Sequence, residues 1–166
     1  MLHFHSPNRL ILKALPLTSN PGTEVVFLNE SGIGVPVSEA DIRFIADAIA
    51  DGENVSFHLV EVAYVDENAI KALNNTYLGK DYITDIITFP YSSADQTNDI
   101  EVTLTCCAQR IDEQTAEFGT ERKAEFCRVI IHGLLHVSGY DDRTDSDSLA
   151  IRNRENYYLD LLNLAT

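Results

Sequence analysis

The sequence contains no tryptophan, a single methionine and only three cysteines among its 166 residues. The odd number and irregular spacing of Cys106, Cys107 and Cys127 argue against a disulfide-stabilised scaffold and fit a reducing compartment. We expect the three side chains to be small buried apolar residues. Long hydrophobic runs are also absent, since no segment approaches the roughly 18 consecutive apolar residues of a membrane span. The sequence therefore predicts a soluble, cytoplasmic protein.

Basic residues are scarce, because 12 lysines and arginines stand against 26 acidic residues and the net charge is -14. Such a chain repels phosphate backbones at long range, so an RNA enzyme of this composition would need a local basic patch or a partner that presents the RNA. The first 23 residues differ, since they hold Arg9 and Lys13 and no acid. We predict an N-terminal extension at residues 1–23, packed on a single domain of residues 24–166.

Alternating and β-branched runs predict four strands, at residues 24–28, 55–65, 83–89 and 99–105. Apolar residues at helical spacing predict five helices, at residues 38–51, from 66 or 68 to 78, 106–118, 120–138 and 145–164. Ser38 and Thr120 are expected as N-caps, and a polar loop is expected at 92–98. The order predicts an α+β fold, with one small mixed sheet of about four strands covered by about five helices.

The segment from residue 132 to residue 142 carries the chemistry and reads His-Gly-Leu-Leu-His-Val-Ser-Gly-Tyr-Asp-Asp. Residues four apart on a helix lie on one face, so His132 and His136 direct both imidazoles to one point. Gly139 favours the left-handed conformation that ends a helix, and the turn would bring Asp142 back toward the histidines. Two imidazoles and a carboxylate suit zinc, with a fourth position left for water. The pattern predicts one divalent ion per chain, held by a helix in the core.

The same segment resembles the signature of the YbeY family of bacterial endoribonucleases, His-Gly-x-Leu-His-x-x-Gly-Tyr-Asp-His. Two upstream blocks resemble the family too, and the similarity covers roughly residues 55–160. The matching residues are His132, Gly133, Leu135, His136, Gly139, Tyr140 and Asp141 in the signature, Asn74, Tyr77, Thr84, Asp85, Phe89 and Pro90 in the second block, and Asp99 and Ile100 in the third.

The resemblance implies an α+β fold, a metal held by three residues, and hydrolysis of phosphodiesters in ribosomal RNA. Ribosomal particles or ribosome-associated proteins are the partners that it implies. The first two ligands fall on His132 and His136. Asp85 and Asp99 fall on positions that are expected to orient ligands or water.

Three positions depart from the family pattern. The third ligand is usually histidine and here is Asp142, which also makes the set suitable for ferrous iron. The arginine that commonly follows the family's tyrosine, expected to contact phosphate, is Leu78. The glycine of the third motif is Asn98.

Together these features predict a zinc-dependent endoribonuclease of ribosomal RNA maturation, in which Asp141 or Asp85 takes or relays a proton. Phosphate contacts are expected from some of Lys71, Lys80, Arg122, Lys123, Arg128 and Arg143. Arg143 stands among carboxylates and is expected to be paired with them.

Three other functions use the same ligands. The first is a non-catalytic ribosome-assembly factor with a structural metal, which the acidic charge and Leu78 favour. The second is a metallopeptidase, which Gly133 disfavours because zinc proteases place their glutamate base at that position. The third is an iron oxygenase, although such ligand sets usually lie on the strands of a barrel. Assays with RNA and with a peptide, each with and without chelator, would separate these classes.

Overall fold

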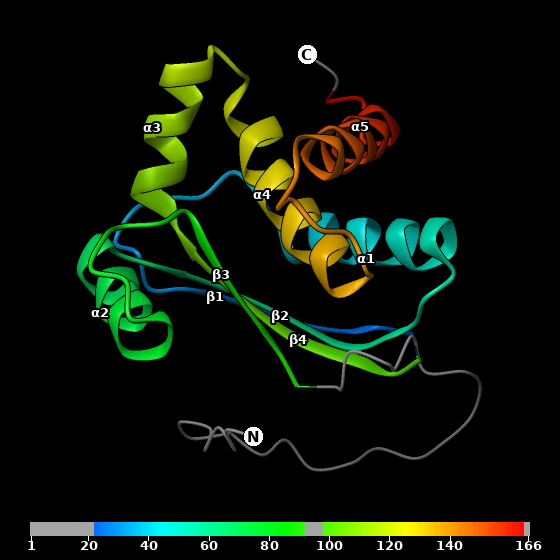
Figure 1. Cartoon of the computed structure of the whole chain (residues 1–166), viewed down its shortest axis with the longest axis horizontal. Coiled ribbons are helices and arrows are strands. Elements are labelled where there is room, and N and C mark those ends of the chain that lie inside the picture. Colours follow the sequence, from blue (N-terminus) through cyan, green and yellow to red (C-terminus); the bar gives the residue numbers. More distant parts are fainter. Residues whose placement is uncertain (1–21, 92–97, 165–166) are drawn as a thin grey trace.

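The computed structural model describes residues 22–91 and 98–164, which form four strands and five helices around one sheet (Figure 1). The predicted extension, through residue 21, and most of the predicted polar loop, residues 92–97, lie outside the described residues. The strands are β1 Glu24–Asn29, β2 Phe57–Val65, β3 Ile86–Pro90 and β4 Ile100–Cys107. The helices are α1 Glu39–Glu53, α2 Glu67–Leu78, α3 Ala108–Phe118, α4 Arg122–Val137 and α5 Asp145–Leu161.

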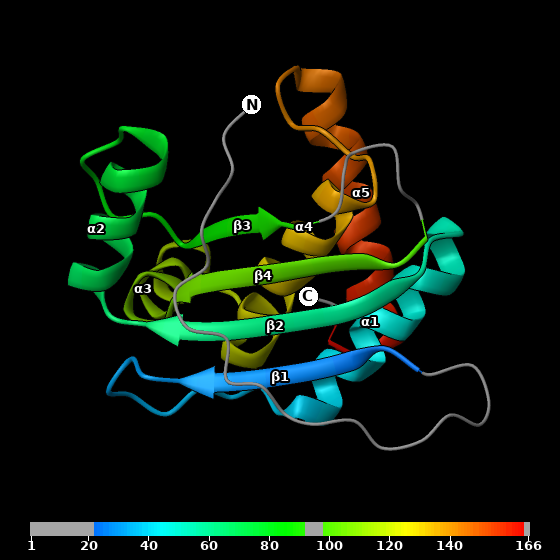
Figure 2. The ribbon, with the colours of Figure 1, turned by 90° about the horizontal axis from the view of Figure 1, so that it is seen from below.

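The sheet is mixed, with the strand order β1-β2-β4-β3 (Figure 2). Strand β2 pairs in parallel with both β1 and β4, whereas β3 pairs antiparallel with β4 at one edge. Figure 1 shows α1, α4 and α5 on one side of the sheet; α1 and α4 contact the strands, and α5 is stacked on these two helices. The predicted α+β class and mixed sheet are confirmed.

The side chains of the adjacent cysteines at the end of β4 point to opposite faces of the sheet, because side chains alternate along a strand. Cys106 is buried in the main core, whereas Cys107 packs with Ile70 and Ile87 between α2 and the other face. The prediction that a helix begins at Cys106 was wrong. Pairing of both cysteines with the end of β2 extends β4 by two residues beyond the predicted Thr105.

Helix α4 is the central helix of the domain and is buried along most of its length. It approaches the sheet closely at Gly133, where an added Cβ would lie 2.8 Å from Leu104 Cδ2 and 2.9 Å from Ile86 Cδ1. Glycine therefore lets α4 pack closely on the sheet, because any side chain there would force Leu104 and Ile86 to shift. The predicted N-cap at Thr120 was wrong, because the longer Glu121 side chain accepts hydrogen bonds from two amides of the first turn.

Two other predicted helix ends are confirmed, whereas α1 runs two residues past the predicted Asp51 and α5 ends three residues before the predicted 164. Ser38 caps α1 in a capping box with Asp41, and Gly79 ends α2 with a φ of 66°. Strand β3 begins at Ile86, three residues later than expected, because its pairing with β4 begins there; the Asp85 side chain accepts a hydrogen bond from the Ile86 amide at this end. Of the helices in the described ranges, none combines the length and apolar character needed to cross a membrane.

Candidate metal centre

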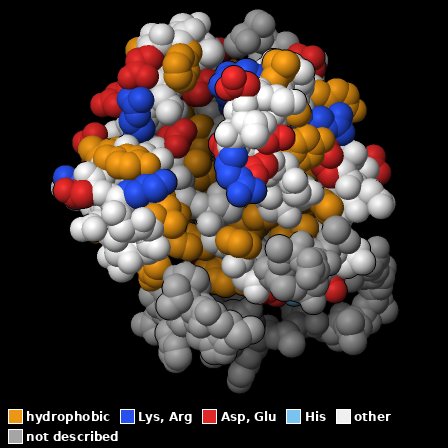
Figure 3. Space-filling view, viewed as in Figure 1, with side chains coloured by type: hydrophobic (Ala, Val, Ile, Leu, Met, Phe, Trp, Pro, Cys, Tyr) orange, Lys and Arg blue, Asp and Glu red, His pale blue; other side chains and the backbone are white. Residues whose placement is uncertain are grey.

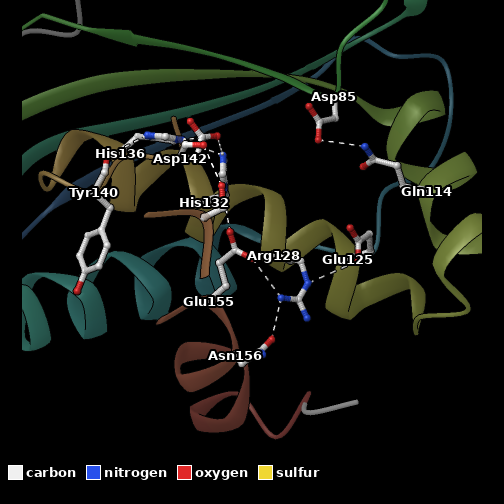
Figure 4. Close-up of polar contacts among 11 residues, drawn as sticks. Asp85, Gln114, Glu125, Arg128, His132, His136, Tyr140, Asp142, Glu155 and Asn156 are labelled. Atoms are coloured by element: carbon white, nitrogen blue, oxygen red, sulfur yellow. Dashed lines mark hydrogen bonds and ion pairs between the residues drawn. The ribbon is translucent and has the colours of Figure 1, made fainter. Parts of the chain in front are cut away.

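The three predicted ligands come together at the C-terminal end of α4 (Figure 4). Their donor atoms all lie within 4.8 Å of one another. The two histidine Nε2 atoms are 2.9 Å apart, and Asp142 Oδ2 lies 3.8 Å from His132 Nε2 and 3.6 Å from His136 Nε2. Ligands about 2.0–2.1 Å from a tetrahedral zinc ion are roughly 3.3 Å apart. The separations therefore fit one small divalent ion.

The hydrogen bonds of the two imidazoles leave both Nε2 atoms free to bind a cation. His132 Nδ1 lies 2.7 Å from the Glu155 carboxylate, and His136 Nδ1 lies 3.1 Å from the backbone oxygen of Tyr140. Both partners are acceptors, so each Nδ1 carries a hydrogen, and a ring without a proton on Nε2 presents its lone pair there. Two lone pairs 2.9 Å apart repel unless a proton or a metal ion lies between them. The donor set thus fits a metal chemically as well as geometrically.

Glu155, on α5, is a site residue that the sequence analysis missed. Glu155 is 3% exposed, and its carboxylate also accepts a hydrogen bond from Arg128 Nη1 at 3.2 Å. Burial raises the pKa of Glu155, but His132 and Arg128 outweigh burial and hold the pKa below its usual value. Burial lowers the pKa of His132, but the hydrogen bond to Glu155 and the charges of Glu155, Asp142 and Asp85 together outweigh burial and raise that pKa above its usual value. A charged Glu155 therefore fixes the ring of His132 and makes it a stronger donor.

The turn after α4 brings Asp142 to the histidines, as the sequence predicted. Gly139 has a φ of 110°, and the Tyr140 amide donates to the carbonyl of Leu135, which folds the chain back over the helix end. Helix α5 holds the turn from the other side, since Ser148 Oγ donates to the Asp142 carbonyl at 2.9 Å.

Tyr140 connects this turn to α1 through a contact that no sequence motif indicated. Its hydroxyl donates to Glu53 Oε2 at 3.0 Å, while its backbone oxygen orients His136. Burial raises the pKa of Glu53, but donors from Tyr158, Arg154 and Tyr140 outweigh burial and keep the carboxylate charged. Glu53 thereby anchors the metal-binding turn to a distant helix.

We expect Tyr140→Phe to lower zinc affinity about tenfold, because a hydrogen bond to a charged group that holds the ligand turn is lost. Zinc titration by calorimetry measures this change. Tyr158→Phe is the matched control, since it removes another hydroxyl from Glu53 without touching the turn. Equal losses in both variants would contradict the anchoring role of Tyr140.

The structure places Asp85 and Asp141 in different surroundings. Asp85 lines the same cavity as His132, and its carboxylate accepts from Gln114 Nε2 at 3.1 Å, toward which it points in Figure 4. Asp141 is paired with Arg143, as expected for that arginine, and also accepts from the Asp142 amide at 2.8 Å. The hydrogen bond from Arg143 lowers the pKa of Asp141, which makes it a weaker proton acceptor.

Asp99 and Asp85 lie at opposite ends of β4. Asp99 precedes β4, whereas the Asp85 carbonyl accepts from the Cys107 amide at the other end of that strand. Strand β4 has 8 residues, so at about 3.3 Å per residue its ends are roughly 25 Å apart. Asp99 is neither in the ligand cluster nor among the residues that line the cavity beside His132, and its expected role in orienting ligands or water stays a prediction. Leu78 is 53% exposed and offers no donor for phosphate.

A cavity of about 180 Å³ opens beside His132, between α3, α4, α5 and the start of β3. Its walls carry both charges, from the residues Asp85, Glu125, Arg128, Arg152 and Glu155, together with Gln114, Ile86, Phe118 and Val129.

Comparisons with known proteins agree with the signature. The family model described as endoribonuclease YbeY matches residues 31–163. An endoribonuclease YbeY from Flavobacterium psychrophilum is 34% identical over 113 residues, covering 68% of this chain and 78% of the relative. One from Alkaliphilus oremlandii is 32% identical over 120 residues, covering 70% and 79%.

Structural comparison agrees as well. The solution structure of a Thermotoga maritima protein is similar, with a TM-score of 0.54, 25% identity, and coverage of 82% of this chain and 87% of that one. With its signature on α4 and a family match that spans almost the whole described domain, the chain belongs to the YbeY family.

Proposed function

We propose that this protein is a zinc-dependent endoribonuclease that acts in the maturation of ribosomal RNA. The observation that carries the proposal is the convergence of His132 Nε2, His136 Nε2 and Asp142 on one point in a chain of the YbeY family. Three protein ligands leave a fourth position open, which is typical of catalytic rather than structural zinc sites.

A zinc ion bound there would supply a water-derived nucleophile at neutral pH and stabilise negative charge on a phosphoryl oxygen. The remaining chemistry comes from side chains. Glu155 and the Tyr140 carbonyl orient the two imidazoles, and Asp142 offsets part of the ion's charge. Asp85 is the better placed of the two candidate proton acceptors, because it lines the cavity beside His132 and is not paired with an arginine.

The packing of Gly133 supports a nuclease over a metallopeptidase. The Cβ of a glutamate base at that position would lie within 3 Å of Leu104 and Ile86 of the sheet, so the site has no room prepared for it. The assembly-factor alternative uses the same ligands and differs only in whether RNA is cleaved. As partners we propose ribosomal RNA in ribosomal particles and the proteins bound to them, and as the location the cytoplasm, where such particles would be processed.

Cleavage of RNA by the zinc-loaded protein tests the proposal. We expect a single-stranded ribosomal RNA fragment to be cut, chelator to stop the reaction, and added zinc to restore it. Asp142→Asn, which keeps the side-chain shape, should slow cleavage by at least about 100-fold because the ligand loses its charge. The measurement is the rate of product formation on a denaturing gel.

Asp145→Asn is the matched control, because it removes the same charge from an exposed residue of α5. It should cleave at the wild-type rate. If the zinc-loaded wild-type protein binds ribosomal particles but cleaves no RNA, the assembly-factor alternative replaces the nuclease. Cleavage of a peptide substrate instead would support the peptidase.

A further inference from the structure

Most basic side chains in the part of the chain that the structure describes are paired with carboxylates of the protein itself. Figure 3 shows lysines and arginines scattered among acidic side chains rather than gathered in a patch on the face in view. The pairs are Arg43 with Glu39, Lys71 with Asp81, Arg110 with Glu113 and Glu117, Arg122 with Asp112, Lys123 with Asp41, Arg128 with Glu125 and Glu155, Arg143 with Asp141, and Arg154 with Glu53. Lys80 lies over the ring of Tyr82.

Arg152 is the exception in residues 22–91 and 98–164. It has no hydrogen bond, ion pair or ring contact to a described residue, and it is exposed on α5. All the basic residues expected from the sequence to contact phosphate, other than Lys80, are held by carboxylates. A guanidinium without a partner retains its full capacity for a phosphate oxygen.

Arg152 occupies the part of α5 that holds the metal centre. Four residues before it, Ser148 Oγ donates to the Asp142 carbonyl, and three residues after it, Glu155 binds His132. Residues three or four apart share a helix face, so Arg152 lies between two contacts to different ligands. It also lines the cavity beside His132.

The cavity wall carries several carboxylates, so an unpaired arginine on it matters for the binding of an anionic substrate. Glu125 and Glu155 share Arg128 between them, and Asp85 adds another carboxylate to the wall. These groups repel a phosphodiester that approaches the metal centre. Arg152 provides the compensating positive charge on the same wall, and its planar donors match two phosphate oxygens at once.

We propose that Arg152 binds a phosphate group of the RNA substrate beside the metal centre. The inference rests on the proposed function, because it names the group that holds the RNA at that site. In this role Arg152 contacts the substrate and does not contact the metal, which is held by its three ligands. Its loss therefore weakens RNA binding without removing zinc.

Steady-state cleavage and RNA binding by Arg152→Gln test the inference. We expect KM for a single-stranded RNA to rise about tenfold, with zinc content and thermal stability unchanged. In fluorescence anisotropy, the slope of log binding constant against log salt should become shallower by about 0.7, the value for one phosphate contact on a single strand. Arg152→Lys should restore part of the affinity, since it keeps the charge but not the planar fork.

Arg43→Gln is the matched control, because it removes one positive charge from an exposed arginine of α1. It should leave KM and the salt slope at wild-type values. A wild-type KM and salt slope in Arg152→Gln would overturn the inference, even where the wild-type protein cleaves RNA. A zinc-loaded wild-type protein that cuts no RNA would instead overturn the proposed function, and the salt slope would still decide whether Arg152 binds phosphate.

Discussion

His136→Ala is expected to leave the protein without bound zinc, whereas wild-type protein supplied with zinc retains about one ion per chain. The substitution removes one of the two Nε2 donors that lie 2.9 Å apart, so a single imidazole and one carboxylate remain. Zinc affinity should fall by more than about 100-fold, which is the upper range for losing a partner that does not itself bind the ion.

Elemental analysis after dialysis measures this loss directly. His58→Ala is the control, because His58 is an exposed histidine on β2 that takes no part in the cluster. Zinc should also raise the melting temperature of the wild-type protein and of the control but not of His136→Ala, since a ligand that binds only the native state stabilises it. Equal zinc content in all three proteins would place the ion elsewhere.

Glu155→Ala is expected to be the most destabilising of these substitutions. It leaves Arg128, whose side chain is 12% exposed, without its closest carboxylate, and it leaves His132 Nδ1 without an acceptor. Removing one partner of a buried ion pair typically costs about 3–5 kcal/mol of unfolding free energy. Losing the carboxylate behind a metal-binding histidine lowers metal affinity about 10- to 100-fold. Chemical denaturation and zinc titration measure the two effects.

Glu155→Gln separates charge from shape in the same experiment. Its amide oxygen can still accept from His132, but the charge that raises the pKa of that histidine is gone. Protons compete with zinc below the pKa of His132, so the loss of zinc affinity on acidification should begin at a lower pH in the variant than in the wild type.

Asp160→Ala, an exposed substitution on α5, is the stability control for Glu155→Ala and should change the free energy of unfolding by no more than about 0.5 kcal/mol. An unfolding free energy of Glu155→Ala equal to that of the wild type would contradict a stabilising role for the contacts of Glu155 with Arg128 and His132.

Local signals were enough to predict most of the fold. Ser38, Gly79 and Gly139 end or begin helices by their own conformational preferences, and the expected strands were found with shifted ends. The errors lie where pairing overrides local preference. Cys106 and Cys107 belong to β4 because β2 pairs with them. Helix α4 is capped by the longer Glu121 side chain and not by Thr120.

By itself, the sequence determined the two histidines and the turn that returns Asp142 to them, because four-residue spacing and a positive φ at glycine are local properties. Only the tertiary structure decided what surrounds them. Glu53 and Glu155 come from other helices, far along the chain from their partners Tyr140 and His132. No spacing rule connects residues that meet only when α1, α4 and α5 pack together, because packing depends on the whole core.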